Sequence, residues 1–375
     1  MTNAREKVED IVVVPEKSEQ QLNHRQLEDY RSFRKDLINW IANLGKSPER
    51  AEGYAYATAR QRSYKIDEFY RWIWNSQEDG YTLNATTRHA DEYSKQLAYS
   101  DDSTTYKAGI QKAVKTLFKY FRHEKNRDID WDPEIQFSNG GSNTHQVRDF
   151  LTDDERRKIK QQVLEYGSIP HYNTVTPEER EQWKRHLAQR FEKPKDQVSK
   201  SDWRRANGWK FPSMIYTAMD AGFRPAEVGR ATTSWLDLEN QMLRIPKEDS
   251  TKNTENWHVA LSERTTEMLK NWVKERENYS KYQGTDRLWL TQYGNPYNSE
   301  SLNRHLKKLC RKAGIPTENR DLTWYSIRHS VGTKMSQEHG TAAVQQQLRQ
   351  KSEEMAVRYD QAPVTDRKNI VNNWD

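Results

Sequence analysis

Arginine, histidine and tyrosine residues near the C-terminal end of the chain are spaced so that they could act together on a phosphodiester. Arg328 is followed at once by His329, and Tyr359 stands between Arg358 and Asp360. The planar guanidinium of arginine can hold two phosphate oxygens at once, and a tyrosine hydroxyl can attack phosphorus to form a covalent ester. These residue types predict phosphoryl transfer without a metal ion.

The order of these residues resembles the signature of the tyrosine recombinase family, also called the phage integrase family. The segment 221–227 is similar to the first arginine box of that family, and Lys252 stands where the family has a lysine in a β-hairpin. The segment 325–330 is similar to the second arginine box, and Tyr359 takes the place of the nucleophile. Tyr-Asp-Gln-Ala-Pro from Tyr359 is similar to archaeal virus and plasmid members. The resemblance covers most of the chain from about Phe150, and more loosely residues 25–125.

Two positions differ from the pattern of the family. Tyr325 stands where a histidine is usual, and Gln350 stands where a histidine or tryptophan is usual. Both can hydrogen-bond a phosphate oxygen, but neither is a good base at neutral pH. The group that deprotonates Tyr359 is therefore left open between Tyr325, His329 and the arginines.

The resemblance implies a role for each remaining site residue. Arg224 and Arg328 would hold the nonbridging oxygens, where charge builds in the transition state. Tyr359 would attack in line to give a 3′-phosphotyrosyl linkage and a free 5′-hydroxyl. Lys252, or alternatively Lys247, would protonate the leaving oxygen.

The expected function is that of a site-specific DNA recombinase or integrase, which integrates or excises a mobile element. The expected partners are double-stranded DNA attachment sites and further copies of the chain in a tetramer, and no cofactor or metal is expected. One alternative is a DNA-binding regulator on the same fold that has lost catalysis through Tyr325 and Gln350. A relaxing topoisomerase without site specificity is another.

The composition is compatible with a DNA-binding protein. The 375 residues include 61 Lys and Arg against 55 Asp and Glu, for a net charge of +6, so a DNA footprint needs local clustering of charge. The single cysteine, Cys310, lies in an apolar helical pattern and is expected in the core. No segment is long and apolar enough to span a bilayer, and the expected location is the cytoplasm, in association with the nucleoid.

Four regions are expected along the chain. Residues 1–24 are polar and predict a flexible arm. Residues 25–126 carry helical apolar stripes that predict a small helical domain, which resembles the core-binding domain of the family and would bind DNA. Residues 127–147 contain Asn, Gly and Ser and predict a linker. Residues 148–375 would form the catalytic domain.

Within the helical domain, apolar stripes run from Phe33 to Leu44, from Ile66 to Ile73 and from Ile110 to Phe121. Ser47 and Pro48 are typical of a helix start. Opposite the third stripe lies a row of basic residues that is either a solvated face or a phosphate-binding face. Its members are Lys112, Lys115, Lys119 and Arg122.

In the catalytic domain, residues 235–238, 242–245 and 257–261 predict a small antiparallel sheet. Residues 167–208 are strongly charged and predict an insertion or a pair of exposed helices. The remainder from Glu300 to Asn373 reads as successive helices. The expected fold is therefore mainly α, with a helical N-terminal domain and an α-rich catalytic domain that carries a small antiparallel sheet. The resemblance implies that this fold is of the DNA breaking-rejoining type.

Overall fold

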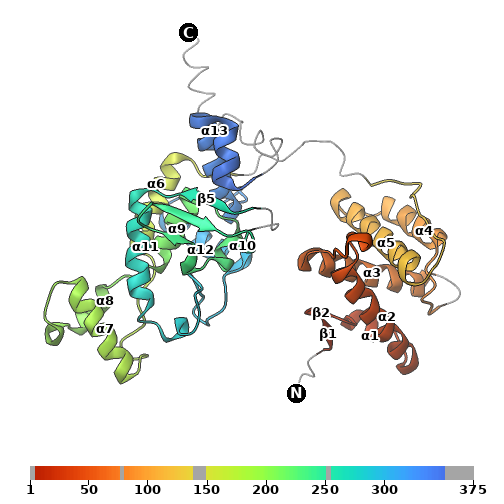
Figure 1. Ribbon diagram of the computed structural model, residues 1–375, viewed down its shortest axis with the longest axis horizontal. Coiled ribbons are helices and arrows are strands. Elements are labelled where there is room, and N and C mark those ends of the chain that lie inside the picture. Colours follow the sequence, from red (N-terminus) through yellow and green to blue (C-terminus); the bar gives the residue numbers. More distant parts are fainter. Residues whose placement is uncertain (1–4, 77–79, 138–148, 251–254, 351–375) are drawn as a thin grey trace, which may run out of the picture. The chain divides into compact units, whose positions relative to one another are not determined.

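The computed structural model describes residues 5–76, 80–137, 149–250 and 255–350, and the chain divides into two units, residues 1–145 and 146–375 (Figure 1). The described residues are mostly helical. They also form a two-stranded hairpin in the first unit and a three-stranded antiparallel sheet in the second. The predicted fold class is confirmed. Within the described ranges no helix is both long and apolar enough to cross a membrane.

The first unit is a helical domain around an aromatic core. Phe33, Tyr70 and Phe121 come from three different helices and pack together in it, in agreement with the predicted stripes. The helices are α2 (His24–Asn43), α3 (Tyr56–Ser76), α4 (Thr87–Ala98) and α5 (Thr104–Glu124). Helix α4 was not predicted from the sequence, because two of its buried positions are the polar residues His89 and Ser94.

The predicted helix start at Ser47 and Pro48 is present, but it gives only a single turn and not the next long helix. Pro48–Arg50 makes one 3₁₀ turn, and Ala51 then takes a left-handed backbone conformation that ends it. The next helix, α3, begins only at Tyr56. A proline at the first helical position favours a turn of helix, but it does not ensure that the helix continues.

The flexible arm expected over residues 1–24 is contradicted for residues 5–24. Strands β1 (Lys7–Val8) and β2 (Ile11–Val12) form a hairpin, followed by the short helix α1 (Glu16–Glu19). The buried Arg34 donates from Nε to the carbonyl of Val13 (2.9 Å), and Ser18 donates to the buried carboxylate of Asp67 (2.6 Å). These contacts order the segment because they satisfy buried polar groups of α2 and α3.

The basic row on α5 lies at the surface, but much of it has partners within its own unit. Lys115 pairs with Asp132 (3.3 Å), and Arg122 pairs with Asp130 (2.6 Å). Lys119 donates to the carbonyl of Lys46 (3.0 Å). These contacts favour a structural role for part of the row.

The second unit is built around helix α9 (Lys210–Ala221), which is almost entirely buried and packs against α6, α11, α13 and β5. The sheet has the order β3-β4-β5. Ile245 of β4 pairs with Trp257 of β5 at the end of the sheet where β4 ends and β5 begins. The strands are β3 (Leu236–Asp237), β4 (Met242–Ile245) and β5 (Trp257–Ala260), close to the predicted positions. The remaining helices of the central body are α6 (Asp153–Gln162), α10 (Pro225–Arg230), α11 (Glu263–Arg276), α12 (Ser299–Lys312) and α13 (Trp324–Leu348), which is interrupted at Gly340.

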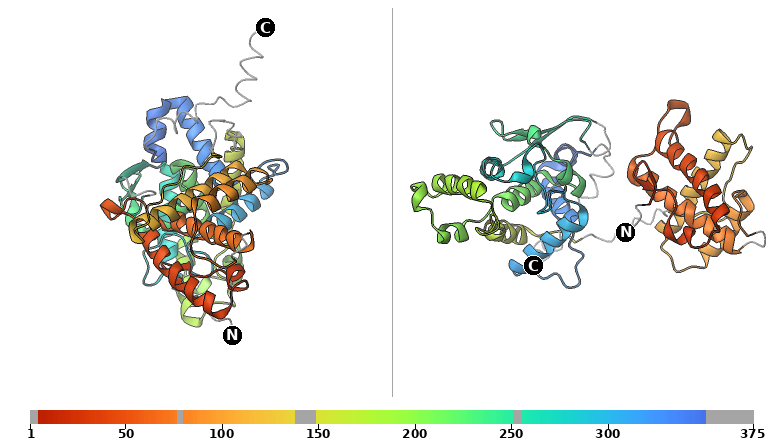
Figure 2. Two further views of the ribbon diagram at one scale, coloured as in Figure 1. Left: turned by 90° about the vertical axis from the view of Figure 1, so that its right-hand side faces the viewer. Right: turned by 90° about the horizontal axis from the view of Figure 1, so that it is seen from below.

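A small lobe between α6 and α9 corresponds to the predicted insertion. It contains α7 (Pro177–Arg190) and α8 (Lys200–Arg205), and it projects from one end of the second unit (Figures 1 and 2). The lobe has its own small core, in which Trp183, Leu187 and Trp203 are buried. Glu275 of α11 ties it to the main body, because its carboxylate accepts a bond from the backbone N–H of Trp209 (3.0 Å) and lies 3.7 Å from Arg190.

Candidate active site at the junction of α9, α10 and α13

The turn between α9 and α10 is pressed against helix α13. Gly222 ends α9 with φ +57°, and a Cβ atom at this position would lie 2.3 Å from Cδ2 of Leu348. Glycine therefore suits the left-handed backbone, and any larger residue would have to displace the end of the Leu348 side chain. Trp324, in the first turn of α13, donates from Nε1 to the carbonyl of Phe223 (3.0 Å). These contacts hold the backbone of Gly222 and Phe223 in place, and so fix the position of Arg224, the next residue.

Arg224 immediately precedes α10, and Pro225 occupies the first position of that helix. Glu227, one turn along, accepts hydrogen bonds from the backbone N–H of Arg224 (2.6 Å) and from its Nη1 (3.1 Å). The side chain of Arg224 is 20% exposed, whereas that of Glu227 is 2% exposed. Glu227 therefore orients an arginine whose side chain still reaches the surface.

Arg328 lies in the second turn of α13 and is 2% exposed. Its Nη1 donates to the carbonyl of Gly222 (2.7 Å), and its Nη2 donates to the carbonyl of Leu348 at the other end of α13. Arg224 and Arg328 thus flank the same turn, on the two segments that the sequence boxes predicted. Of the two guanidinium groups, that of Arg224 is the more accessible.

Arg349 is a third arginine at this junction. It follows α13 in a left-handed conformation (φ 56°), which costs a residue other than glycine about 1–2 kcal/mol. Its Nε and Nη2 hold the two carboxylate oxygens of Glu227 at 3.0 and 2.8 Å. Its Nη1 donates to the carbonyls of Ala221 (2.9 Å) and Gln347 (2.7 Å). The buried ion pair therefore ties the end of α13 to both sides of the turn before α10.

Glu227 is the negative centre of the arginine cluster. Burial would raise the pKa of its carboxyl, but the positive charges of Arg349, Arg224 and Arg328 outweigh burial and lower the pKa to about 2. Three cations around one buried carboxylate leave an excess of positive charge. Such a site is suited to an anion such as a phosphate group.

Tyr325 and His329 flank Arg328 on α13. Tyr325 is 37% exposed and lies one turn before Arg328, whereas His329 is half-buried. Gln350 follows Arg349 and is buried, with its backbone N–H bound to the carbonyl of Gln345 (2.8 Å). All three residues that the sequence proposed as auxiliary members therefore lie on α13 or directly after it.

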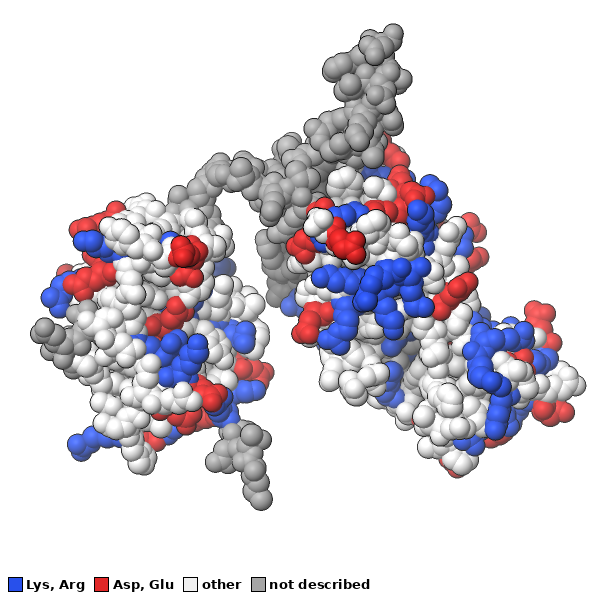
Figure 3. Space-filling model, turned by 180° about the vertical axis from the view of Figure 1, so that it is seen from behind, with Lys and Arg blue, Asp and Glu red and all other residues white. Residues whose placement is uncertain are grey.

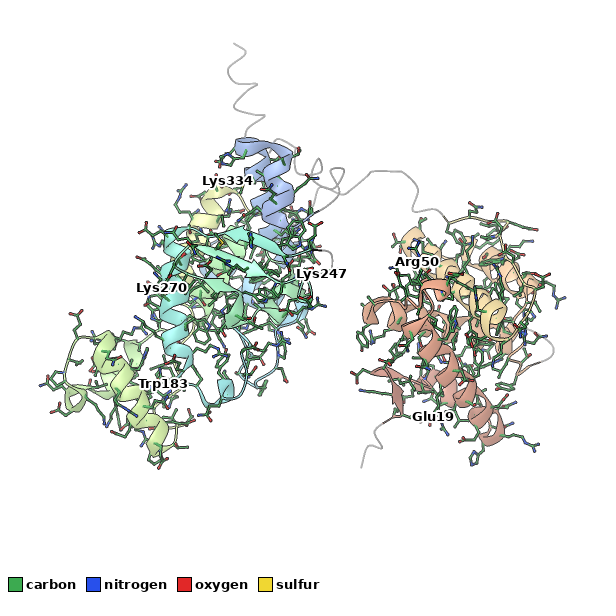
Figure 4. All side chains as sticks on the ribbon, viewed as in Figure 1. Glu19, Arg50, Trp183, Lys247, Lys270 and Lys334 are labelled. Carbon is green, nitrogen blue, oxygen red and sulfur yellow. The ribbon has the colours of Figure 1, made fainter. Side chains whose placement is uncertain are left out.

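The β4–β5 hairpin is connected to the same junction. Gln347 of α13 donates from Nε2 to the carbonyls of Ala260 and Asp220, both at 2.9 Å, and so joins the edge strand β5 to the end of α9. Lys247 is exposed where β4 runs into the turn, at the end of the sheet (Figure 4). Lys252 and Tyr359 lie outside the described residues.

Helix α12 carries a separate concentration of positive charge. Its inner face buries Leu302, Leu306 and Leu309 together with Cys310, which confirms the core position predicted for the cysteine. Its outer face forms the large basic patch in the middle of the second unit in Figure 3, with exposed Arg304, Lys307, Lys308, Arg311 and Lys312. Among the described residues, only Arg304 of these five forms an ion pair, with Glu300 (3.0 Å). We call this surface the α12 basic face.

Residues 202–364 match the model of the phage integrase family. This part of the chain is a phage integrase domain. Members of the family break and rejoin DNA strands, so the chain is an integrase or site-specific recombinase, as the sequence predicted. The phage integrase domain contains α9, α10, the sheet and the whole arginine cluster.

Solved structures share the fold of this chain. One is the XerH site-specific recombinase bound to difH substrate, with 16% identity and a TM-score of 0.55, over 95% of this chain and 90% of that one. Another is the Tn1549 transposon integrase in complex with transposon right end DNA, with 12% identity and a TM-score of 0.55, over 90% of this chain and 99% of that one. These identities establish similarity of fold. No curated protein sequence matches the chain.

Two residues of the cluster were not among the predicted site residues. Glu227 could have been found from the sequence. A glutamate two residues after a proline is typical of the first turn of a helix, where its carboxylate binds the backbone N–H before the helix. Arg349 could not have been found in this way, since its role depends on a left-handed backbone and on Glu227, 122 residues away in sequence.

Proposed function

We propose that the chain cleaves and rejoins DNA at specific attachment sites through a covalent 3′-phosphotyrosyl intermediate on Tyr359, and so integrates or excises a mobile element. The convergence of Arg224 and Arg328 on one turn beside Glu227 carries this proposal. Two cations that approach one point from different segments can neutralise the pentacoordinate phosphorane-like transition state from two sides. A protein that only binds DNA needs no such convergence.

The reaction divides the roles among the site residues. The hydroxyl oxygen of Tyr359 attacks phosphorus and passes its proton to one of the candidate groups on α13, Tyr325 or His329, while the bond to the 5′ oxygen of the next nucleotide breaks. Lys252, or Lys247 in its place, supplies a proton to that oxygen, and Tyr325, His329 or Gln350 can hydrogen-bond the phosphate. Because the phosphotyrosine ester retains the energy of the broken bond, a 5′-hydroxyl of a second duplex can reverse the step and complete strand exchange.

DNA is the proposed partner, and the α12 basic face is its proposed contact on the second unit. The XerH and Tn1549 proteins of similar fold were solved on DNA. Four cations of the α12 basic face form no ion pair with any described carboxylate, in contrast to Lys115 and Arg122 of α5. We also propose that the chain acts as a tetramer on its attachment sites, in association with the nucleoid.

The α12 basic face can be tested by a matched pair of double variants. We expect Lys307→Gln with Lys308→Gln to weaken DNA binding and to reduce the slope of log K against log salt concentration by about 1–2, because each lost phosphate contact removes about 0.9. The control is Lys270→Gln with Lys274→Gln, at two exposed lysines on α11, and it should leave the slope unchanged. Lys270 is labelled in Figure 4. Equal losses in both pairs would show that net charge, not this face, governs binding.

Covalent trapping tests the proposed function directly. Duplexes selected from a random pool for tight binding to the full chain are nicked beside the candidate scissile phosphate, so that the released fragment diffuses away and rejoining is blocked. We expect a denaturation-resistant adduct, and trypsin should place the DNA on the peptide 359–367, in which Tyr359 is the one tyrosine. A duplex that is bound tightly but never gives an adduct would favour the noncatalytic regulator.

A further inference from the structure

Arg349 makes more contacts than a helix-capping residue requires. Its five N–H groups all have acceptors, namely both carboxylate oxygens of Glu227 and the carbonyls of Ala221, Gly222 and Gln347. An arginine fork that fits a carboxylate on two parallel bonds fixes direction as well as charge. Arg349 therefore determines where the carboxylate plane of Glu227 lies.

Glu227 passes this constraint on to Arg224. The oxygen Oε1 accepts from Nε of Arg349 (3.0 Å) and from Nη1 of Arg224 (3.1 Å). The oxygen Oε2 accepts from Nη2 of Arg349 (2.8 Å) and from the backbone N–H of Arg224 (2.6 Å). Each carboxylate oxygen is thus shared between the two arginines, and a change at Arg349 must alter the support of Arg224.

The backbone conformation of Arg349 also indicates that its contacts with the turn before α10 are its main role. A left-handed residue directly after a helix is usually glycine or asparagine, because these residues adopt this conformation at little cost in energy. The local backbone therefore gives no reason for an arginine at this position. Arg349 also begins the connection from α13 to Tyr359, ten positions later. The same side chain therefore anchors the exit of α13 at the turn that carries Arg224.

We propose that Arg349 is a positioning residue of the strand-cleavage reaction, acting through the carboxylate of Glu227 to hold the guanidinium of Arg224 in its phosphate-binding orientation. It does not itself contact the phosphate, because all five of its N–H groups are already bound to acceptors of the protein. This inference rests on the proposed cleavage by the same site. It predicts that the fork geometry of Arg349, and not its charge alone, supports the rate.

The test compares single-turnover cleavage of the nicked duplex by Arg349→Lys and by the wild-type chain. Lysine keeps the positive charge beside Glu227 but cannot form two parallel bonds. We expect the cleavage rate to fall by about 10- to 100-fold, the loss typical of a small displacement of a catalytic group, while the Kd for DNA stays within about twofold. Arg185→Lys, at an exposed arginine on α7 outside both the arginine cluster and the α12 basic face, is the matched control and should leave the cleavage rate unchanged.

A double-variant cycle separates positioning from a merely structural role. If Arg349 acts through Arg224, Arg349→Lys should slow cleavage little further in an Arg224→Lys background, because the orientation that it supports is already lost. Rate losses that multiply across the two sites would overturn the proposal, as would a full wild-type rate in folded Arg349→Lys. Should the lysine variant fail to bind DNA, Arg349→Gly replaces it, since glycine relaxes the left-handed backbone and removes the fork. A wild-type rate in Arg349→Gly would also overturn the proposal.

The proposed function and this inference fail in different ways. A wild-type chain that binds the duplex but forms no adduct overturns both. If the wild-type chain forms the adduct but Arg349→Lys and Arg224→Lys slow cleavage independently of each other, only the proposed role of Arg349 is overturned.

Discussion

Replacing Tyr359 with phenylalanine is expected to abolish the covalent adduct while DNA binding is retained. Phenylalanine keeps the ring but lacks the oxygen that forms the ester, so the arginine cluster can still hold the phosphate without any bond being exchanged. Binding of the nicked duplex should be within about twofold of wild type, because most of the affinity comes from phosphate contacts elsewhere. Denaturing gels measure the adduct, and band shifts measure the binding.

Tyr325→Phe is the matched control for this substitution. Tyr325 is an exposed tyrosine that lies one helical turn from Arg328, so it has the chemistry and the position of a competing nucleophile. We expect Tyr325→Phe to keep an adduct on Tyr359, with a slower rate if its hydroxyl binds the phosphate or takes the proton. Loss of the adduct in Tyr325→Phe together with its persistence in Tyr359→Phe would exchange the roles of the two tyrosines.

The sequence was most informative where a structure depends on neighbours in the chain. The apolar stripe from Ile110 to Phe121 became α5, and the run Met242–Ile245 became β4, because the side-chain period of each decides which face is buried. The turn with Arg224 was found from its box because its geometry is local: Gly222 ends one helix and Pro225 begins the next.

The sequence was least informative where a polar group is satisfied by a distant segment. Residues 5–24 look too polar to fold, yet their carbonyl and hydroxyl groups satisfy Arg34 and Asp67 inside the helical domain. Arg349 likewise reads as one more surface charge until its partner on α10 is known. Buried polar pairs of this kind depend on tertiary structure, and local patterns do not reveal them.

The arginine cluster also makes a prediction about stability. Among the described residues, Glu227 supplies the carboxylate that pairs with Arg349, whose side chain is 2% exposed. Replacing Glu227 with glutamine removes this carboxylate and leaves the buried charge of Arg349 without its partner. Breaking a buried ion pair by removing one partner typically costs about 3–5 kcal/mol. Urea unfolding of the full chain at neutral pH should show a loss of this size in the transition of the second unit. Glu300→Gln, at an exposed ion pair on α12, should change it little.

The loss caused by Glu227→Gln should depend on pH in a defined direction. The pKa of Glu227 is about 2 in the folded chain against 4.5 for an ordinary glutamate, so the unfolded chain binds the proton first as the pH falls. The stabilisation from the ionised carboxylate is therefore complete above about pH 4.5 and is lost as the pH falls towards 2. The difference in unfolding free energy between wild type and Glu227→Gln should shrink over that range. A difference that stays constant from pH 7 to pH 3 would show that Glu227 is not held ionised by the arginines, and would remove the basis for its control of Arg224.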